Sequence, residues 1–397
     1  MRVVVINTGT EILLGDVRDA HLSFIAREIL PLGLRVSEQR TVPDGEAIRN
    51  ALVDLLPGAD IVFVTGGLGP TTDDVTREMV AEVCGVELVH SEEIMRTITE
   101  RLKKRGIKFT DRISRQAMVP KGARVLPNKN GTAPGFYLPK QHLFVLPGPP
   151  RELQPMFRES AMSILHEIVP PPQFEKRMYR IAMMGESLVE KAIGEQIKEV
   201  ELGYCARPGE VDVRIIGEPK AIARADEIIR REIGLSIFST EDETLAEVLL
   251  KLLKKRGETL AVAESCTGGL LANRLTNVAG SSEVFLAGYV TYANEAKIDM
   301  LNVDARLIEQ HGAVSPEVAR AMAEGARTRA RSTYALATTG IAGPGGGSAD
   351  KPVGTIHVAL ASPNETQAKK FFFPSDRETF KDLAAQAAFD LLRRQLQ

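Results

Sequence analysis

The stretch Ala59–Asp74, ADIVFVTGGLGPTTDD, is a run of β-branched and aromatic residues that ends in a glycine-rich loop. Such a run predicts a buried strand, and the glycines predict a turn at its carboxyl end. Similar short apolar runs occupy Val3–Ile6 and Leu34–Thr41, with a helical pattern between them. Strands that alternate with helices are typical of a parallel sheet with helices on both faces. We therefore predict a three-layer α/β domain with a mostly parallel sheet at the start of the chain.

The rest of the chain divides where its composition changes. Three successive prolines in VPPPQ, residues 169–173, suit a stiff linker. Residues 174–240 show a strand–helix–strand–helix pattern, which predicts a small α+β unit. Alternating helices and strands resume near residue 243, which predicts a second α/β domain. The predicted domains are therefore 1–170, 174–240 and 243–397.

Several helix starts are predicted from local sequence alone. Asp44 and Asp74 each precede a helical pattern and could cap it, and Ser315 is followed by a proline at the first helical position. Ser375 and Glu378 have the spacing of a capping box for the final helix.

Composition excludes several functional classes. The 397 residues carry a net charge of -2, so no basic field favours nucleic acid or an anionic membrane. The three cysteines are far apart and form no metal-binding framework, which fits a reducing cytosol. The amino terminus shows no signal-peptide pattern, and no apolar run approaches the roughly 20 residues that span a bilayer. We expect a cytoplasmic protein.

The stretch Leu260–Ala272, LAVAESCTGGLLA, places a serine and a cysteine between a predicted strand and a predicted helix. Such a turn offers backbone N–H groups and the positive end of a helix dipole. Ser265 or Cys266 could attack an amide carbon there. Equally, Ser265 could be a helix cap, and Cys266 a buried small residue.

A second glycine-rich loop, TTGIAGPGGG at Thr338–Gly347, follows another predicted strand. It is neither a Walker A loop nor a dinucleotide fingerprint, since no lysine follows it and no helix pattern opens after it. It could cradle a phosphate or complete an oxyanion hole. Arg377 could add a bidentate phosphate contact, or be an exposed arginine in the first turn of a helix.

Two adjacent carboxylates, Asp73 and Asp74, follow the first glycine loop. They suit Mg²⁺ or Mn²⁺ bridging a pyrophosphate better than a phosphate by itself. Asp16 and Glu152 are weaker candidates for further ligands. The stretch NKNGTAPG, Asn128–Gly135, is expected to line the same cleft.

Six stretches carry a resemblance to a known family: NTGTEILLGD, VTGGLGPTTDDVT, LPGPPRE, AESCTGGLLA, GYVTYANEAK and TTGIAGPGGG. In this order they resemble the CinA family, the competence/damage-inducible proteins, along essentially the whole chain. The resemblance implies a molybdopterin-binding-like first domain that hydrolyses ADP-ribose with Mg²⁺, Mn²⁺ or Co²⁺. It implies a KH-type connecting domain, in which Leu188 replaces the second glycine of the RNA-clamping loop, so that a connecting role is favoured. The last domain is similar to nicotinamide mononucleotide amidohydrolases, which release ammonia and need no cofactor.

The resemblance also implies roles for single residues. Ser265 is the implied nucleophile, and Tyr292 and Lys297 belong to the same active site. A Ser–Lys pair needs a lysine that is often neutral, which burial favours; from its local sequence alone, Lys297 would be a solvated helix residue. The expected substrate-binding residues of the last domain are Thr267, Gly268, Gly269, Thr339, Gly340, Gly343, Gly345 and Arg377. The expected nucleotide-binding residues of the first domain are Thr8, Gly9, Thr65, Gly66, Gly67, Gly69, Asn128, Gly131, Pro147 and Gly148, with Asp73 and Asp74 for the metal.

The sequence thus predicts an enzyme of pyridine-nucleotide salvage with two sites, one for nicotinamide mononucleotide and one for ADP-ribose, assembled as a homodimer. One departure is His21, which stands where the family usually has asparagine. Two alternatives are a non-catalytic nucleotide sensor and a molybdopterin-cofactor binding protein. The paired Asp73 and Asp74 and the attached amidohydrolase-like domain argue against the second alternative.

Overall fold

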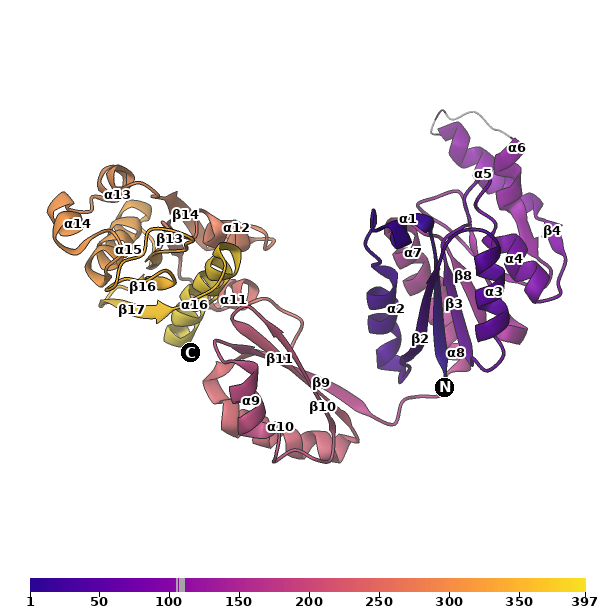
Figure 1. The fold of residues 1–397 in the computed structure, drawn as a ribbon, viewed down its shortest axis with the longest axis horizontal. Helices are drawn as coiled ribbons and strands as arrows, with labels where there is room; N and C mark the ends of the chain where they lie inside the picture. Colours follow the sequence, from indigo (N-terminus) through magenta and orange to yellow (C-terminus); the bar gives the residue numbers. More distant parts are fainter. Residues whose placement is uncertain (105, 107–110) are drawn as a thin grey trace. The chain divides into compact units, whose positions relative to one another are not determined.

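The computed structural model describes residues 1–104, 106 and 111–397. The chain forms two compact units, Met1–Gln173 and Phe174–Gln397. The colour bar of Figure 1 identifies the residues of each unit. The boundary falls at the end of the predicted proline-rich linker. The further division of the second unit at residues 240–243 stays a prediction.

The first unit is built on a six-stranded sheet with the order β2-β1-β3-β8-β7-β6. Its strands are β1 (Val3–Thr8), β2 (Val36–Val42), β3 (Ile61–Thr65), β8 (Leu143–Leu146), β7 (Gly135–Leu138) and β6 (Arg124–Leu126). The first four run parallel, and β7 and β6 pair antiparallel. The predicted mostly parallel sheet is therefore confirmed.

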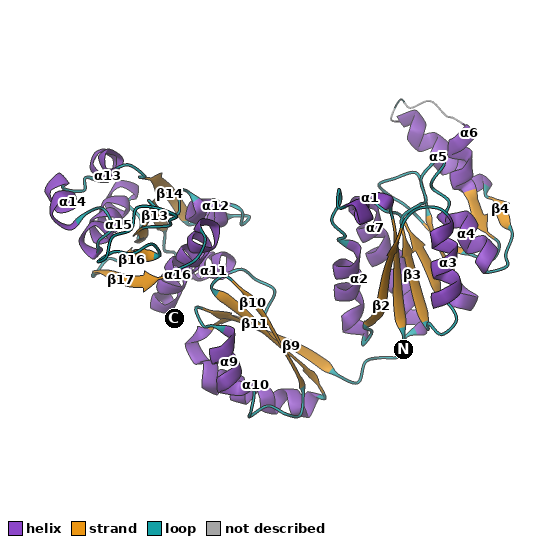
Figure 2. Ribbon diagram, in the orientation of Figure 1, coloured by secondary structure: helices purple, strands orange, loops and turns teal. Residues whose placement is uncertain are grey.

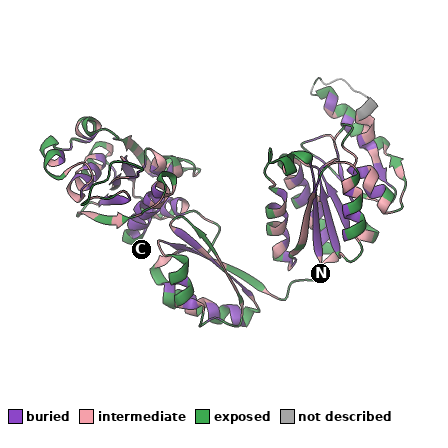
Figure 3. Ribbon diagram, viewed as in Figure 1, coloured by how far each residue is buried: buried purple, intermediate pink, exposed green. Residues whose placement is uncertain are grey.

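Alternate residues of the central strands face two different helical layers. Val3 and Val5 of β1 pack into one apolar cluster, and Val4 and Ile6 pack into the other. The covering helices are α2 (His21–Ile29), α7 (Pro150–Met156) and α8 (Met162–Ile168) on one face, and α3 (Glu46–Leu55) and α4 (Thr76–Val83) on the other. Figures 2 and 3 show the buried strands between these helices. The predicted three-layer architecture follows from this alternation.

Shorter elements complete the first unit. A two-stranded antiparallel ribbon joins β4 to β5, and α5 packs its apolar side into a small separate cluster. The remaining elements are α1 (Thr10–Leu14), β4 (Leu88–His90), α5 (Glu92–Lys104), α6 (Asp111–Ser114), β5 (Met118–Pro120), the 3-10 helices η1 (Leu30–Leu32), η2 (Arg115–Ala117) and η3 (Pro139–Gln141), and the π-helix η4 (Phe157–Ala161).

The second unit begins with a four-stranded antiparallel sheet of order β10-β11-β9-β12. Its elements are β9 (Glu175–Ala182), α9 (Glu186–Ile193), β10 (Glu201–Arg207), β11 (Glu210–Gly217), α10 (Pro219–Ile233), η5 (Gly234–Ser236) and β12 (Ile237–Ser239). The predicted α+β arrangement is confirmed, although β10 and β12 are strands that the predicted strand–helix–strand–helix pattern did not include.

A five-stranded sheet of order β14-β13-β15-β16-β17 forms the rest of the second unit. Its elements are α11 (Leu245–Arg256), β13 (Leu260–Glu264), α12 (Leu270–Thr276), η6 (Ser281–Glu283), β14 (Phe285–Val290), α13 (Asn294–Leu301), α14 (Ala305–His311), α15 (Pro316–Ala330), β15 (Tyr334–Gly340), β16 (Thr355–Ala361), β17 (Thr366–Phe372) and α16 (Arg377–Leu396). Strands β14, β13 and β15 are parallel, and β16 and β17 are antiparallel. Large aliphatic residues of these strands pack with α11 and α16, and alanines pack with α15.

Polar and apolar contacts join the two sheets of the second unit. Phe238 of β12 belongs to the same buried cluster as α11 and α16. The Gln386 side chain donates a hydrogen bond to the buried Glu210 carboxylate, which also pairs with Arg180 at 3.3 Å. The four-stranded sheet therefore contributes to the buried core of the second unit.

Three of the predicted helix caps are wrong. The Asp44 carboxylate accepts hydrogen bonds from the backbone and hydroxyl of Thr10, and the following helix starts at Glu46 after Gly45. Asp74 accepts hydrogen bonds from Thr71, two residues before its helix begins. The final helix is capped by Asp376 rather than by Ser375.

The predicted cap at Ser315 is confirmed, with the proline at the first helical position. No helix in the described part of the chain has the length and apolar content to cross a bilayer.

A fragment of residues 174–397 is expected to unfold in one cooperative transition, because its two sheets share buried contacts. A fragment that starts at residue 243 lacks Phe238 and leaves Gln386 without Glu210. It should be less stable by roughly 2–4 kcal/mol. Urea unfolding of the two purified fragments measures the difference, and equal free energies of unfolding would contradict the prediction.

Candidate functional sites

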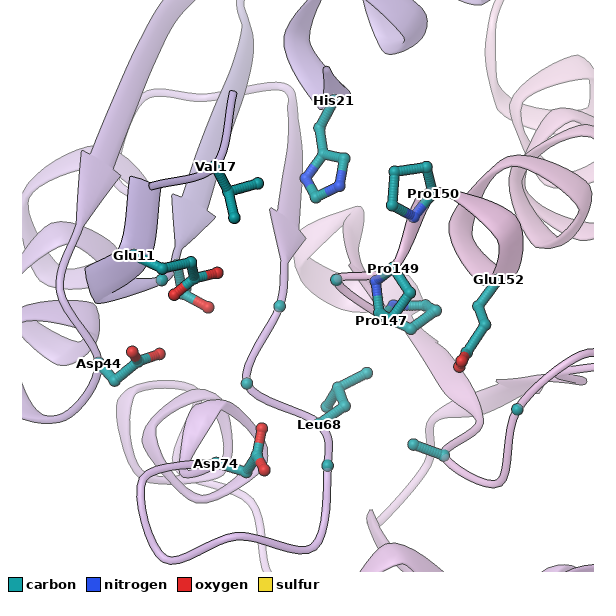
Figure 4. A pocket seen from close by; sticks show the side chains of 18 of the residues that line it. Glu11, Val17, His21, Asp44, Leu68, Asp74, Pro147, Pro149, Pro150 and Glu152 are labelled. Carbon is teal, nitrogen blue, oxygen red and sulfur yellow. The ribbon is translucent and has the colours of Figure 1, made fainter. Parts of the chain in front are cut away.

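A cavity of about 560 Å³ opens at the carboxyl ends of β1, β3 and β8 in the first unit. In this sheet β1 lies between β2 and β3, so the chain leaves β1 and β2 toward opposite sides. Ligands of open α/β sheets bind at such a reversal of strand order. Figure 4 shows side chains from several loops around this space.

Most of the predicted first-domain residues line this cavity. They are Thr8, Gly9, Gly66, Gly67, Gly69, Asp73, Asp74, Gly131, Pro147 and Gly148. Glu152 also lines it, and Asp16, an exposed residue, does not. Two further predicted residues lie behind the wall. The Thr65 hydroxyl is fully buried and donates to Asn7, and Asn128 braces a neighbouring loop.

Glycine is required in the loop after β3 because the backbone there is both twisted and crowded. Gly66 and Gly67 have φ angles of 98° and 64°, in the region that favours glycine. A Cβ atom on Gly66 would lie 2.5 Å from the Thr8 hydroxyl oxygen, and one on Gly67 would lie 2.0 Å from that of Thr76. The glycine-rich turn predicted at the carboxyl end of this strand is therefore confirmed.

Asn128 holds the loop 128–135, which was predicted to line the cleft, through hydrogen bonds to its backbone. Its Oδ1 accepts from the amides of Asn130 and Gly131, and its Nδ2 donates to the carbonyl of Ala133 and to Glu152 at 2.8 Å. Its four hydrogen-bonding positions are thus used inside the protein. Asn128 therefore positions Gly131 and Glu152, which do face the cavity.

The cavity is strongly acidic. Among the described residues it is lined by six carboxylates and a single arginine, Arg18. The carboxylates are Glu11, Asp19, Asp44, Asp73, Asp74 and Glu152. An anionic ligand would be repelled here unless a cation accompanied it.

The predicted metal ligands have suitable chemistry without forming a closed site. In the described ranges no three His, Cys, Asp or Glu side chains converge as a ready-made metal site. Mg²⁺ is commonly held by one or two carboxylates together with substrate phosphates. Asp73 and Asp74, which both line the cavity, fit this second mode.

The second candidate site lies at the carboxyl ends of β13, β14 and β15. Backbone hydrogen bonds join Ser265 N to Thr338 O at 3.0 Å and Thr291 N to Glu264 O at 2.8 Å. These bonds hold the turn after β13 between the ends of its two neighbours. The structure therefore brings the predicted Ser265, Tyr292 and Thr339 to one edge of the sheet.

Ser265 and Cys266 differ sharply in environment. Ser265 is half-buried, whereas Cys266 is 5% exposed and belongs to the apolar core. Burial raises the pKa of the Cys266 thiol to about 12. A thiol that stays protonated at neutral pH is a poor nucleophile, so Cys266 fits the structural reading of the sequence.

Lys297 is buried with 1% exposure, which contradicts the surface position that its local sequence suggested. Burial lowers the pKa of its ammonium group. Its Nζ donates to the carbonyls of Thr291, Tyr292 and Ala293 at 2.9, 3.1 and 3.4 Å. Within the described part of the chain no hydrogen bond joins Lys297 to the Ser265 hydroxyl, so the two are not paired in this state.

Glu264 was not predicted as a site residue, although it stands in the quoted motif. Its carboxylate is fully buried and accepts from the backbone amides of Gly269, Leu271 and Ala272 at 2.9–3.0 Å. The sequence pattern predicts amides at this helix start that are open to a ligand. Three of them are instead satisfied by Glu264, which makes the turn rigid.

The other predicted residues of the last domain fall into two groups. Thr267 and Thr339 are buried, with hydroxyl bonds of 2.8 Å to Thr338 and 2.7 Å to the Ala313 carbonyl. Arg377 is exposed and donates to the Gly343 carbonyl and to the Tyr292 hydroxyl, both at 2.7 Å. The arginine thus joins the second glycine loop to the end of β14.

Gly268, Gly269, Gly340 and Gly345 have different local constraints. The first two have φ angles of 61° and 95° in the turn after Ser265. A Cβ on Gly340 would lie 2.8 Å from the Thr355 carbonyl oxygen, whereas one on Gly345 would meet nothing within 4 Å. Gly345 therefore lies in an open part of the loop, where a ligand could approach.

Comparison with known proteins agrees with the two α/β folds. Residues 242–396 match the family model described as the CinA C-terminal domain, and residues 4–167 match that of a probable molybdopterin binding domain. The CinA-like protein of Akkermansia muciniphila is 41% identical over 396 residues, which are 98% of this chain and 96% of that protein. The chain belongs to the CinA family.

Other CinA relatives have similar coverage. The CinA-like protein of Citrifermentans bemidjiense is 41% identical over 413 residues, covering 100% of this chain and 98% of its own. Among solved structures, the competence/damage inducible protein CihA of Agrobacterium tumefaciens is 42% identical over 38% of this chain and 94% of its own, with a TM-score of 0.38.

Replacing Glu264 by glutamine in this CinA protein is expected to lower the free energy of unfolding by roughly 1.5–3 kcal/mol, because one acceptor oxygen and the charge that binds three amides are lost. Chemical denaturation measures the change. Glu324→Gln, an exposed helix position, is the matched control and should be neutral. Equal behaviour of the two variants would show that the Glu264 charge does not stabilise the turn.

Proposed function

We propose that this CinA protein is a two-site nucleotide hydrolase of pyridine-nucleotide salvage. The second unit would add water to the amide of nicotinamide mononucleotide and release ammonia and nicotinic acid mononucleotide. The first unit would add water to the pyrophosphate of ADP-ribose and release AMP and ribose 5-phosphate. The contrast between half-buried Ser265 and core-buried Cys266 supports the deamidation. The acidic cavity of the first unit supports the hydrolysis of ADP-ribose.

In the deamidation, Ser265 Oγ attacks the amide carbon and its proton passes to Lys297. The low-dielectric surroundings of Lys297, which lower its pKa, favour the neutral amine that this step needs. On losing its proton, the amine gives up at least one of its carbonyl hydrogen bonds and can turn toward Ser265. The protonated lysine then supplies the proton on which ammonia leaves, and water releases the acyl group from the serine.

The negative charge that forms on the amide oxygen needs backbone donors. Glu264 occupies the amides of Gly269, Leu271 and Ala272. The oxyanion is therefore assigned to the amides of Cys266 and Thr267, earlier in the same rigid turn. Buried Cys266 then serves the reaction through its backbone while its side chain fills the core.

The ribose phosphate of nicotinamide mononucleotide is assigned to Arg377 and the second glycine loop. Arg377 is held beside Gly343 and Tyr292, and its exposed guanidinium has donors suited to a phosphate. Tyr292, 60% exposed, would lie between the phosphate and the reacting amide. This arrangement gives Tyr292 an orienting role.

In the first unit, Asp73 and Asp74 would hold the divalent metal, and the bound metal would neutralise the pyrophosphate and polarise its phosphorus–oxygen bonds. The Thr71 bonds fix the Asp74 carboxylate in direction. The glycine loop after β3 lets the pyrophosphate approach the backbone. Glu152, fixed by Asn128, closes the opposite wall.

A homodimer is part of the proposal. Strand β14 is at the edge of its sheet and exposes Leu286 and Val290, each 47% exposed. An exposed apolar edge strand is a common place for pairing with a second copy. Sedimentation of the purified chain measures its mass, and a monomer at micromolar concentration would remove this part of the proposal.

Replacing Ser265 by alanine is expected to reduce ammonia release from nicotinamide mononucleotide by several orders of magnitude; loss of the serine in subtilisin costs roughly 10⁶. Cys266→Ala should change the rate less than about threefold, because its thiol stays protonated. Lys297→Met should match the serine variant, and the double variant should be hardly worse than either. Activity that survives Ser265→Ala and is lost in Cys266→Ala would assign the nucleophile to the thiol.

Removal of divalent metal with EDTA is expected to stop ADP-ribose hydrolysis and to leave deamidation unchanged, since the proposed deamidation uses only protein groups. Asp74→Asn should reduce ADP-ribose hydrolysis by roughly 10²-fold or more. Asp16→Asn, which does not line the cavity, is the matched control and should stay active. Product chromatography measures both reactions. Loss of deamidation in EDTA would overturn the Ser–Lys route.

A further inference from the structure

The start of α16 carries two cationic side chains, Arg377 and Lys381. They are four residues apart, which is the spacing of neighbours on one face of an α-helix. Arg377 donates to the Gly343 carbonyl of the second glycine loop. The Lys381 ammonium lies at the other glycine-rich turn, where its Nζ is 3.9 Å from the position that a Cβ atom on Gly268 would take. The two cations therefore stand beside the two glycine-rich segments of the second candidate site.

Contacts on both sides of Lys381 hold the first two turns of α16 against this site. Asp382 pairs with Arg274 of α12 at 2.7 Å. Phe380 is fully buried, and its ring would lie 3.0 Å from a Cβ atom on Gly340 at the end of β15. The backbone of Lys381 is therefore fixed next to the turn that follows β13.

The pair of cations is electrostatically unfavourable by itself. Like charges at positions i and i+4 of a helix repel each other, and cations at a helix N-terminus meet the positive end of the helix dipole. Lys381 is half-buried, and within the described ranges no carboxylate pairs with it or with Arg377. An anion bound between the two side chains would offset both penalties.

The backbone amides near this place are largely occupied, so side chains must supply the donors for an anion. The Asp376 carboxylate accepts from two amides in the first turn of α16, both at 3.0 Å. The Glu264 carboxylate occupies three amides at the start of α12 in the same way. Arg377 uses two of its five N–H groups, on Gly343 and Tyr292, and the remaining ones are available with the Lys381 ammonium.

We propose that Lys381 is a specificity-determining residue of the second site, which binds the phosphate of the nucleotide together with Arg377. The inference rests on the proposed function of the second unit and adds a second cation to its phosphate contact. A phosphate monoester carries close to two negative charges at neutral pH, which two cations match. In the described part of the chain, only the Lys381 ammonium lies within 4 Å of the outer side of Gly268, which leaves space there for a phosphate. The site would thus favour a mononucleotide over the corresponding riboside, which has no phosphate.

Three substitutions isolate the charge of Lys381. Lys381→Met removes the ammonium and keeps an unbranched side chain, and Lys381→Arg keeps the charge. Lys255→Met is the matched control, since Lys255 is an exposed lysine of α11 that has no ion pair in the part of the chain that the structure describes. Because Lys381→Met removes a like-charge repulsion, its melting temperature should be unchanged or higher. A residue with a merely structural role would instead lower the melting temperature.

The experiment is calorimetric titration of the full chain with nicotinic acid mononucleotide, the product of the proposed deamidation, so that no turnover disturbs the measurement. Lys381→Met should weaken binding about 10-fold, because one charge-assisted contact to the phosphate is lost. The loss should become smaller at high ionic strength. Lys381→Arg and Lys255→Met should bind like the natural chain. Nicotinic acid riboside should bind the natural chain and every variant alike.

The outcomes separate this inference from the proposed function. Natural affinity of Lys381→Met for the mononucleotide, or an equal loss of riboside affinity, overturns the role of Lys381. A Lys381→Arg variant that binds as weakly as Lys381→Met also overturns it. If the expected pattern is found but the natural chain releases no ammonia from nicotinamide mononucleotide, the proposed deamidation fails and the phosphate site stands. Failure of the natural chain to bind the mononucleotide overturns the phosphate site, whereas ammonia release alone decides the deamidation.

Discussion

In each large sheet, the first strand in the sequence lies between the next two parallel strands. Successive connections therefore run to opposite sides of that first strand. Strand β1 lies between β2 and β3, and β13 lies between β14 and β15. The helices that follow these strands cover opposite faces, α2 against α3 in one unit and α12 against α15 in the other. The loops at the carboxyl edge therefore diverge, and in the first unit the cavity lies between them. Gly9, just after β1, lines this cavity, and Ser265 stands at the corresponding place just after β13.

Backbone amides and carbonyls crowded at these edges need internal partners. Asn128 in the first unit and Glu264 in the second each satisfy several backbone groups from a single buried side chain. A buried group satisfied in this way fixes its loop, because moving the loop would break several hydrogen bonds at once. The loops of both candidate sites are thus held in place by buried side chains, Asn128 in the first unit and Glu264 in the second.

Strong local patterns predicted the fold well. The buried strand predicted before the first glycine-rich loop is β3, Ile61–Thr65, which is a continuous run of mostly β-branched and aromatic residues. Strand β10 was missed because most of its residues are half-buried or exposed, which leaves little periodic signal. Asp44 and Asp74 were assigned as caps by a local rule, but Thr10 and Thr71 compete for their carboxylates. Contacts of this kind depend on folded loops, which local sequence does not specify.

The sequence predicted which loops form the candidate sites, but it predicted less well which side chains of those loops face the site. The glycines of both loops were found, because their backbone demands leave a signature in sequence. Thr65 and Asn128 belong to the right loops but point inward, and only the packed structure decides that direction. Glu11 and Asp19 were missed, since isolated acidic residues in a loop carry no pattern until the fold gathers them around one cavity.

The two sites differ in charge, and this difference limits how each can hold an anion. Among the described residues, the first is lined by six carboxylates and one arginine, so a phosphate must arrive with a cation or meet repulsion at short range. At the second, Arg377 donates to the Gly343 carbonyl and the Tyr292 hydroxyl, and an exposed guanidinium is a group suited to direct contact with a phosphate. Deep burial of Lys297 adds a second cation whose charge is costly unless its carbonyl partners remain. Burial lowers the pKa of Lys297, so a neutral amine forms more readily there than on a lysine in water.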